Sequence, residues 1–428
     1  MPPRDDQGAE TGPGAAGRAQ GITGPLRQPL FRAWIGANAV SLVGNWSQRT
    51  TVGWLIWNET QSTAMVGLIV FLELAPTLLL ALHAGALADR ANKATVIRNC
   101  HLLSCLVAAG FTGALLAGWP VVACAAVYVI VNGMLVAADQ PSRMAIVRDL
   151  VPVPLIPTAV ALNSMVFNTA RLLGPPLAAL LILTLGGWAG IAAYALMLLP
   201  VAAVMHLRVR PHLADRAATV PADGLRVAAM RGLQHILQTR FILALILLQA
   251  VLGLCVRPLL ELMPAIVGLR FDGDAAMLAL LTSVAGVGAL LGGALIAVIR
   301  RVPSLAGVMW AATFAVPLCA LGLAVAPAAV ASVAASLCLG LMLVVSGVTT
   351  QSLLQLRVNP DLLGRVLGVY GVVFRAMPAF GALATGLMAD RFGLVTAVGA
   401  FAVVFWAAAL AIARWSADEV SRVVRGHP

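Results

Sequence analysis

The sequence predicts an all-α membrane protein with twelve transmembrane helices, arranged as two six-helix bundles related by pseudo-two-fold symmetry. Hydrophobic residues make up 61% of the 428-residue chain and charged residues only 11%, and the mean hydropathy of +0.94 is far above the soluble globular range. The charged residues cluster between apolar runs of about 20 residues, a length that spans a bilayer as helix. A polar stretch at 157–180 also recurs about 207 residues later, at 364–384.

The two copies of this stretch align Phe167 with Phe374, Gly174 with Gly381, and Asn168 with Arg375. An arginine such as Arg171 in hydrocarbon costs at least about 2.5–3.5 kcal/mol, so residues of this kind face a bundle interior or a wet cavity. Asn163 lies in the same stretch. A polar membrane helix in each half is typical of transporters built from two parallel repeats. We therefore expect Asn163, Asn168, Arg171 and Arg375 to bind solute.

The apolar runs divide the chain into domains. We predict a disordered cytoplasmic tail at 1–28, a first six-helix bundle at 29–208, a linker with an amphipathic helix at 209–239, a second bundle at 240–415, and a cytoplasmic tail at 416–428. The predicted spans lie near 30–57, 64–87, 94–117, 120–143, 157–184, 188–208, 240–267, 275–299, 304–326, 328–356, 362–388 and 393–415.

Basic residues set the predicted orientation. If the first span starts inside, the outer loops hold only Arg270 and Arg391. The inner loops then collect Arg90, Lys93, Arg98, Arg143, Arg148, Arg208, Arg210, Arg216, Arg226, Arg231, Arg300, Arg301, Arg357 and Arg365. Because cytoplasmic loops are enriched in Lys and Arg, this asymmetry predicts that both termini are cytoplasmic.

The first and seventh spans each carry an arginine, Arg49 and Arg257, at matched positions. Two arginines at equal depth would line a central cavity from opposite sides and bind solute. Alternatively, each arginine snorkels or pairs locally near the outer face.

The second span contains Glu73 and ends in the motif Gly85-Ala-Leu-Ala-Asp89-Arg90-Ala-Asn-Lys93. This motif resembles G-x-L-a-D-R-x-x-[RK] of the major facilitator superfamily. The resemblance implies that Gly85, Asp89, Arg90 and Lys93 form a conformational latch between the halves. The corresponding loop of the second half, 293–301, has no aspartate at the matching position. Similar letters at Gly386–Gly393 fall on the opposite face, so we expect a turn there.

The third and fourth spans bring further polar residues toward the inner surface. Arg98 and His101 are expected to be interfacial anchors. Asp139 and Arg143 are four residues apart and share a helix face, where an ion pair can form. Asp139 is a candidate proton site, with Glu73 and Glu261 as the other intramembrane carboxylates. Alternatively, the Asp139–Arg143 pair only locks the inner gate.

Small residues in the fifth span follow the antiporter motif of exporters in this superfamily, G-x8-G-x3-G-P-x2-G-G. Gly174 and Pro175 match by identity, whereas Ala161, Ala170, Ala178 and Ala179 match by size. The resemblance implies a gating role for Gly174 and Pro175 and favours export. An ordinary contact between small-residue helices would also explain these residues.

From about Pro29 to Ala413 the order of features resembles the enterobactin-exporter-like branch of bacterial drug and siderophore exporters, in stretches such as NWSQRTTVGWLIW and VRPLLELMPAIV. That branch implies a bacterial inner-membrane transporter that exports a siderophore-like or drug-like solute by proton antiport and alternating access. An arginine-rich path favours an anionic solute. The alternative is proton-coupled uptake, or multidrug efflux of a cationic or neutral solute.

Several other functions are disfavoured. The chain has no phosphate-binding G-x-x-x-x-G-K-[ST] loop for ATP, no basic arm with aromatic residues for nucleic acid, and no ligand cluster for an enzyme or a metal. We expect no cofactor. The expected partners are a small-molecule solute, protons and the lipid bilayer, and the expected state is a monomer.

Overall fold

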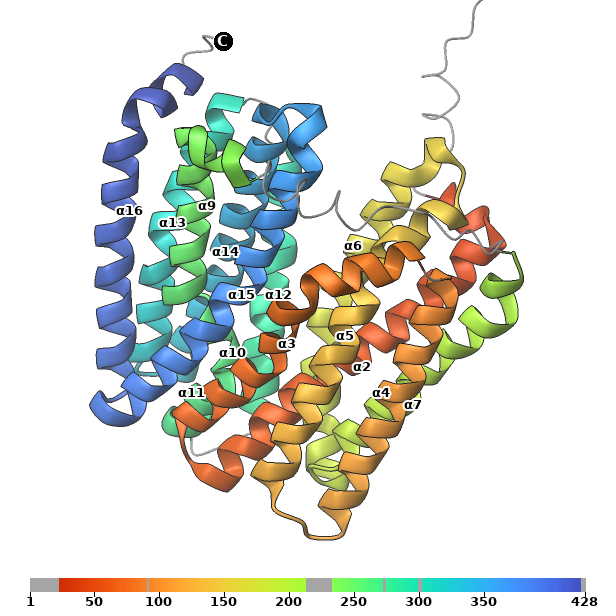
Figure 1. The fold of residues 1–428 in the computed structure, drawn as a ribbon. Helices are drawn as coiled ribbons and strands as arrows, with labels where there is room; N and C mark the ends of the chain where they lie inside the picture. The colour runs from red at the N-terminus through yellow and green to blue at the C-terminus, as the bar shows by residue number, and fades with distance from the viewer. Residues whose placement is uncertain (1–22, 91, 213–232, 272–274, 299–301, 425–428) are drawn as a thin grey trace, which may run out of the picture.

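The computed structural model describes residues 23–90, 92–212, 233–271, 275–298 and 302–424. Within these residues the chain forms helices joined by short turns and contains no strand. Two bundles of helices lie side by side, formed by the first and second halves of the chain (Figure 1). The predicted amphipathic helix of the linker lies largely outside the described residues.

The first bundle contains six long helices. In chain order they are α2 (Pro29–Thr60), α3 (Thr63–Arg90), α4 (Lys93–Leu116), α5 (Val121–Leu150), α6 (Ile156–Leu185) and α7 (Ala189–Val204). The last of these continues through a π-helical turn, Met205–Val209. The turns between them are short, so consecutive helices run in opposite directions.

The second bundle repeats this order, except that its first helix is broken. The segments are α9 (Arg240–Cys255), α10 (Pro258–Glu261), α11 (Met263–Arg270), α12 (Ala275–Val298), α13 (Val302–Val325), α14 (Ala329–Arg357), α15 (Pro360–Phe392) and α16 (Leu394–Val424). The sequence predicted one span over 240–267. Pro258 begins α10 and Pro264 is the second residue of α11, and because neither has an amide hydrogen, the helix turns twice instead of continuing.

Ten helical segments of the described chain are long and apolar enough to cross a membrane. To these we add α2 with 32 residues and α3 with 28 residues. Together they give the twelve membrane-length segments that the sequence predicts, and the protein is a multi-pass membrane protein.

Equivalent helices pack together in both bundles. The packed pairs α2–α6, α2–α7, α3–α5 and α4–α7 of the first bundle recur as α9–α15, α9–α16, α12–α14 and α13–α16 in the second. This repetition confirms the pseudo-two-fold relation. The two bundles meet mainly through α3 against α15 and α6 against α12.

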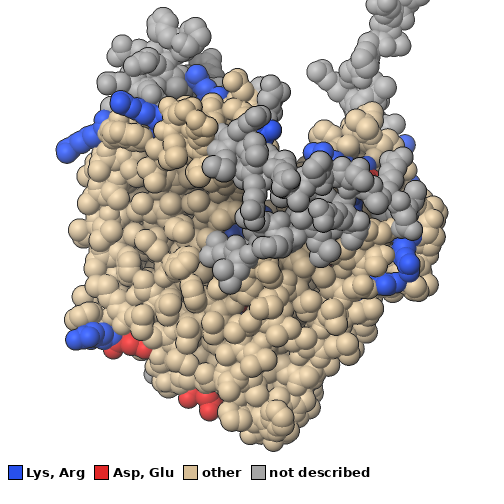
Figure 2. Space-filling model, in the orientation of Figure 1, with Lys and Arg blue, Asp and Glu red and all other residues tan. Residues whose placement is uncertain are grey.

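The two ends of the molecule differ in charge. The starts of α2, α4 and α9 and the ends of α5, α14 and α16 carry arginine or lysine and lie at one end, where the second bundle also ends its chain. Lys and Arg gather at this end in the space-filling view (Figure 2). We call it the arginine-rich end.

At the opposite end the two bundles are tightly packed. Pro264 and Gly268 of α11 lie against Gly53 and Trp57 of α2, with so little space that a side chain on either glycine would overlap its neighbour. Ile266 and Val267 are fully buried there. Because α11 belongs to one bundle and α2 to the other, this contact seals the end between them. We call it the closed end.

Close backbone contact also joins α3 to α15 near the closed end. A Cβ atom on Gly67 would overlap the carbonyl oxygen of Ala382, and a Cβ on Gly386 would lie 2.6 Å from the carbonyl oxygen of Thr63. Small residues let membrane helices approach in this way. The expectation of a turn at Gly386–Gly393 is wrong, because α15 remains helical to Phe392.

Candidate functional site

Charged side chains between the bundles form a first cluster near the closed end. Arg49 of α2 pairs with Glu73 of α3 through Nε and Oε1 at 3.2 Å, and with Glu261 of α10 through Nη2 and Oε2 at 3.2 Å. The side chains are 17%, 18% and 27% exposed, respectively. The pair with Glu73 lies within the first bundle, whereas the pair with Glu261 joins the two bundles.

Arg171 lies beside this cluster. The guanidinium groups of Arg49 and Arg171 both lie over the ring of Trp46, and each Cζ atom is 5.4 Å from the ring centroid. These residues and Glu261 line a cavity of about 70 Å³, which Pro175 also borders. Among the described residues Arg171 forms no ion pair, so its side chain is a charged group without a fixed counterion.

Arg257 and Arg375 come from the second bundle. The guanidinium of Arg257 stacks on the ring of Phe374 at 3.4 Å, and its Nη1 donates to the Phe374 carbonyl oxygen at 3.4 Å. Arg375 is exposed, and neither arginine forms an ion pair within the described chain. Neither lines the small cavity or the larger cavity described below. Their predicted role in solute binding stays a prediction.

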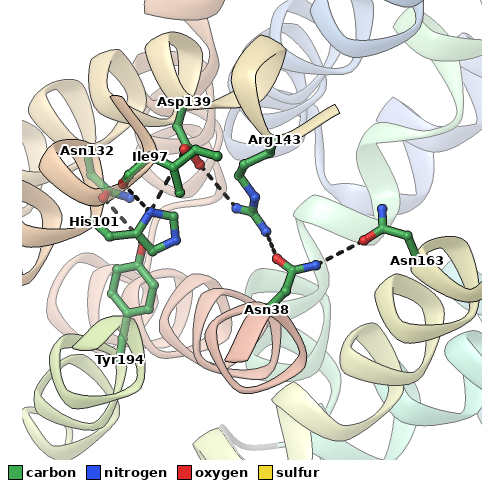
Figure 3. A network of polar contacts seen from close by, with 8 residues as sticks. All are labelled: Asn38, Ile97, His101, Asn132, Asp139, Arg143, Asn163 and Tyr194. Atoms are coloured by element: carbon green, nitrogen blue, oxygen red, sulfur yellow. Dashed lines mark hydrogen bonds and ion pairs between the residues drawn. The ribbon is translucent and has the colours of Figure 1, made fainter. Parts of the chain in front are cut away.

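A second polar cluster lies toward the arginine-rich end, within the first bundle (Figure 3). Arg143 donates from Nη1 to Asp139 Oδ2 at 3.4 Å, which confirms the pair predicted from their spacing. Its Nη2 donates to Asn38 Oδ1, and Asn38 Nδ2 in turn donates to Asn163 Oδ1 at 3.0 Å. This chain of contacts links α5, α2 and α6.

His101 belongs to the same cluster, and its expected role as an interfacial anchor is wrong. The side chain is 4% exposed, with Nδ1 at 2.9 Å from the Ile97 carbonyl oxygen and 3.9 Å from Asp139 Oδ1. A carbonyl oxygen only accepts hydrogen bonds, so Nδ1 carries the hydrogen. His101 Nε2 and Asp139 Oδ1 are both buried without a hydrogen-bond partner in the described chain.

These residues line a larger cavity of about 140 Å³. Trp34, Asn38, His101, Asp139, Arg143, Asn163, Phe167 and Tyr194 are among the lining residues. Trp34 Nε1 also lacks a hydrogen-bond partner among the described residues, so the wall holds an unused donor beside the unused positions of His101 and Asp139. Buried polar groups normally have hydrogen-bond partners, so the unpaired groups in this wall could bind a polar solute or a proton.

An aromatic pair lies where the two cavities approach each other. Phe167 lines the larger cavity and Trp46 the smaller one, and their rings meet edge to face with centroids 5.8 Å apart. Asn168 is next to this pair, but its Nδ2 donates to the Ser164 carbonyl oxygen of its own helix at 2.9 Å. Asn168 therefore lines neither cavity, unlike Asn163.

The predicted gating residues are distributed over three places. Gly174 packs so closely on Trp46 that a Cβ would overlap it. Lys93 pairs with Asp149 at 2.7 Å at the arginine-rich end. Arg98, which was predicted as an interfacial anchor and not as a gating residue, contacts His206 Nδ1 at 3.1 Å near Lys93. The backbone of Gly85, Asp89 and Arg90 lies in the last turns of α3, and their side chains lie outside the described residues.

A further polar contact between the bundles could not be predicted from the sequence. Asp390, at the end of α15, accepts hydrogen bonds from Ser62, Thr63 and Ala64 at the start of α3. The one sequence feature that pointed to it was the second match to the latch motif, at Gly386–Arg391.

Among the described residues, no group of three or more His, Cys, Asp or Glu side chains could hold a metal ion.

Known proteins resemble the chain over nearly its whole length. A bacterial homologue of the human lysosomal transporter Spinster has a TM-score of 0.69 at 15% identity and covers 93% of this chain and 98% of its own. The nucleoside transporter NupG has a TM-score of 0.68 at 13% identity and covers 90% and 98%. At these identities the similarity shows the fold alone.

Sequence comparison identifies the family. The staphyloferrin A transporter of Staphylococcus aureus (strain NCTC 8325 / PS 47) is 26% identical over 160 residues, which are 36% of this chain and 39% of that protein. The family described as transmembrane secretion effector, within the major facilitator superfamily, matches residues 20–423. The chain belongs to this family of membrane transporters and is not an enzyme.

Proposed function

We propose that the protein exports a small anionic solute, such as a metal-chelating siderophore, in exchange for protons and by alternating access. The observation that carries the proposal is the charge between the bundles. Among the described residues, the three guanidinium groups of Arg49, Arg171 and Arg257 lie near two carboxylates, those of Glu73 and Glu261. One positive charge therefore remains for a solute to neutralise. The similarity to a staphyloferrin A transporter supports a siderophore as solute.

The arginine-rich end is proposed to face the cytoplasm of a bacterial inner membrane, with both termini on that side. The support is the enrichment of basic residues in cytoplasmic loops. In this orientation the closed end faces outward, and the larger cavity lies on the cytoplasmic side of the closed-end seal. The Spinster homologue with similar fold was solved in an inward-facing and unoccupied conformation, and the same state fits this arrangement.

Asp139 is proposed to take up the coupling proton at Oδ1, which has no hydrogen-bond partner among the described residues. Protonation removes the negative charge that holds Arg143, so Arg143 is left with its contact to Asn38. Arg143 then becomes free to bind an anionic solute. At the other cluster, a proton on Glu261 would free Arg49 from the second bundle and loosen the closed end.

Transport by inverted vesicles tests the direction, the coupling and the charge of the solute. Vesicles with the cytoplasmic side outward and an acidic interior are given citrate, 2,3-dihydroxybenzoylserine or ethidium. We expect accumulation of an anionic probe that stops when the pH gradient is collapsed. Arg171→Ala should lower the rate about tenfold, since it removes the charge without a counterion, whereas Arg391→Ala at the surface should not.

Other results would replace the proposal. Accumulation of ethidium without either anion would make the protein a multidrug exporter of cations. Accumulation of an anion only in right-side-out vesicles with an inward proton gradient would make it an uptake system. An unchanged rate in Arg171→Ala would remove this arginine from the solute path.

A further inference from the structure

We propose that Asp390 is a gate residue that holds the closed end shut by capping helix α3 from the opposite bundle. Its carboxylate accepts hydrogen bonds from Ser62 Oγ at 2.5 Å, from Thr63 N at 2.7 Å and from Ala64 N at 3.1 Å. The donors are Ser62, immediately before α3, and the first two residues of α3, all in the first bundle. Asp390 lies at the end of α15, in the second bundle.

The start of α3 depends on this outside carboxylate. The first amides of a helix have no partner within the helix and carry partial positive charge. The first turn of α3 contains no acidic residue of its own. Ser62 Oγ accepts from Met65 N at 3.1 Å and donates to Asp390, so Ser62 and Asp390 together satisfy three amides. A negative charge here also interacts favourably with the helix dipole.

The hydrogen bonds between Asp390 and the start of α3 can form only while α3 and α15 are packed together at the closed end. Gly386 lies one turn before Asp390 and touches the backbone of Thr63 and Ala64, and Gly67 touches Ala382 in the same way. Backbones this close leave no room for relative movement that keeps the hydrogen bonds. Separation of α3 from α15 at this end therefore breaks the three bonds together. A group that stabilises only one state shifts the equilibrium toward it.

The position of Asp390 makes the contact reversible. Asp390 is exposed, so water replaces its partners when the end opens, and the open state does not contain a buried unpaired charge. Arg391, the adjacent basic residue, is placed over the ring of Phe392 at 5.6 Å and pairs with no carboxylate among the described side chains. Among the described residues, the Asp390 carboxylate therefore bonds only to Ser62 and the first two residues of α3.

Thiol labelling measures the opening directly. Thr282 lines the small cavity behind the closed end, and Thr282→Cys reports when a membrane-impermeant maleimide reaches it from that side. The full chain in lipid vesicles is labelled from each side in turn, without solute or pH gradient. Mass spectrometry identifies the modified peptide, so the native cysteines do not interfere.

Loss of the cap should make labelling from the closed side about tenfold faster in Asp390→Ala, which is the effect of losing a good helix cap. Asp390→Asn should fall between Asp390→Ala and the unchanged protein, because its amide oxygen still accepts one hydrogen bond. Ser62→Ala combined with Asp390→Ala should add little to the single change, since both act through one contact. Glu59→Gln, an exposed acid at the same end, should leave the rate unchanged.

An unchanged labelling rate in Asp390→Ala, when Glu261→Gln does raise it, would overturn the proposal. Equal acceleration from Glu59→Gln would also overturn it, since the effect would then be surface charge. Because the assay uses no solute and no gradient, its result is independent of whether the protein exports anions.

Discussion

At the scale of single residues, the two carboxylate oxygens of Asp139 have different surroundings. One carboxylate oxygen pairs with Arg143, and the other is buried and meets no donor in the described chain. An intramembrane carboxylate with an unused oxygen beside a cavity can accept a proton without first losing a partner. Its neighbours His101, Arg143 and Tyr194 also face the cavity.

We predict that Asp139→Asn separates solute movement from the proton gradient. Gradient-driven transport should fall by about tenfold or more, because the proton can no longer couple to the solute site. Solute exchange across the membrane at equal pH should continue, because the amide still hydrogen-bonds to Arg143. The two rates are measured in the same proteoliposomes.

Asp149→Asn is the matched control, because Asp149 lies on the same helix and pairs with Lys93 at the arginine-rich end. It should leave gradient-driven transport intact. If Asp139→Asn is still driven by the gradient at the original rate, the coupling group must be sought at Glu73 or Glu261.

The residue pairs that could be predicted from sequence are those along one helix. Asp139 and Arg143 are four positions apart, and this spacing determines their contact. The contacts of Asn38 with Asn163, and of His101 with Asp139, cross between helices. They depend on how each helix is rotated about its axis, and α5 is apolar on most of its faces, so its sequence pattern gives no rotation.

At the scale of helices, contact between α2 and α6 depends on Gly174. A Cβ added here would overlap Trp46 Cβ and lie 2.9 Å from the backbone nitrogen of Ser47. Neither atom can move without shifting α2, on which Arg49 and Trp46 depend for their positions. Gly174 therefore supports the small cavity through backbone contact.

We predict that Gly174→Ala lowers stability by about 1–3 kcal/mol, the range for inserting one methyl group into a tightly packed contact. The melting temperature of the purified protein in detergent should fall accordingly. Gly110→Ala, in the exposed face of α4 with nothing within 4 Å, should be neutral or slightly stabilising. A Gly174→Ala protein as stable as Gly110→Ala would show that the two helices can separate freely.

The positions of the helices could be predicted from hydropathy, but their ends could not. The fourth span was predicted to end near 143 and continues to Leu150, and the last was predicted to end near 415 and continues to Val424. The last turns of these helices contain charged residues, and because a hydropathy pattern marks only the apolar run, it predicts that the helix ends before them. The break at Pro258 was missed because the apolar run continues through it.

At the scale of the whole molecule, Arg49 offers two ion pairs of equal length that differ in what they join. The pair with Glu73 stays inside the first bundle, and the pair with Glu261 connects the bundles. We predict that Glu261→Gln favours opening of the closed end and Glu73→Gln does not. Distances between spin labels on the two bundles at that end should lengthen only in Glu261→Gln.

The size of the shift should be modest, about three- to tenfold in the ratio of open to closed molecules, because the side chains are partly exposed and their attraction is screened. Equal lengthening in both variants would mean that Arg49 acts through its total charge instead of through a link between the bundles.

The similar packing within the two bundles could be anticipated from the repeat at 157–180 and 364–384, since related sequences adopt related packing. The direction in which the molecule is closed could not be anticipated. Which end is closed depends on small free-energy differences between two conformations in which the same helices pack differently. The contact of Asp390 with α3 is one such difference, and a sequence pattern does not compare two conformations.

The contact between Phe167 and Trp46 lies between the two cavities, so it sets the order in which a solute moving from one cavity to the other would meet the side chains. A solute that moves from the larger cavity to the smaller one would contact the ring of Phe167 before it reaches Arg49 or Arg171, whose guanidinium groups lie over Trp46. If a guest takes this route, a planar guest would gain stacking on the two aromatic rings before it reaches the guanidinium groups. Its shape would then affect its passage before its charge does.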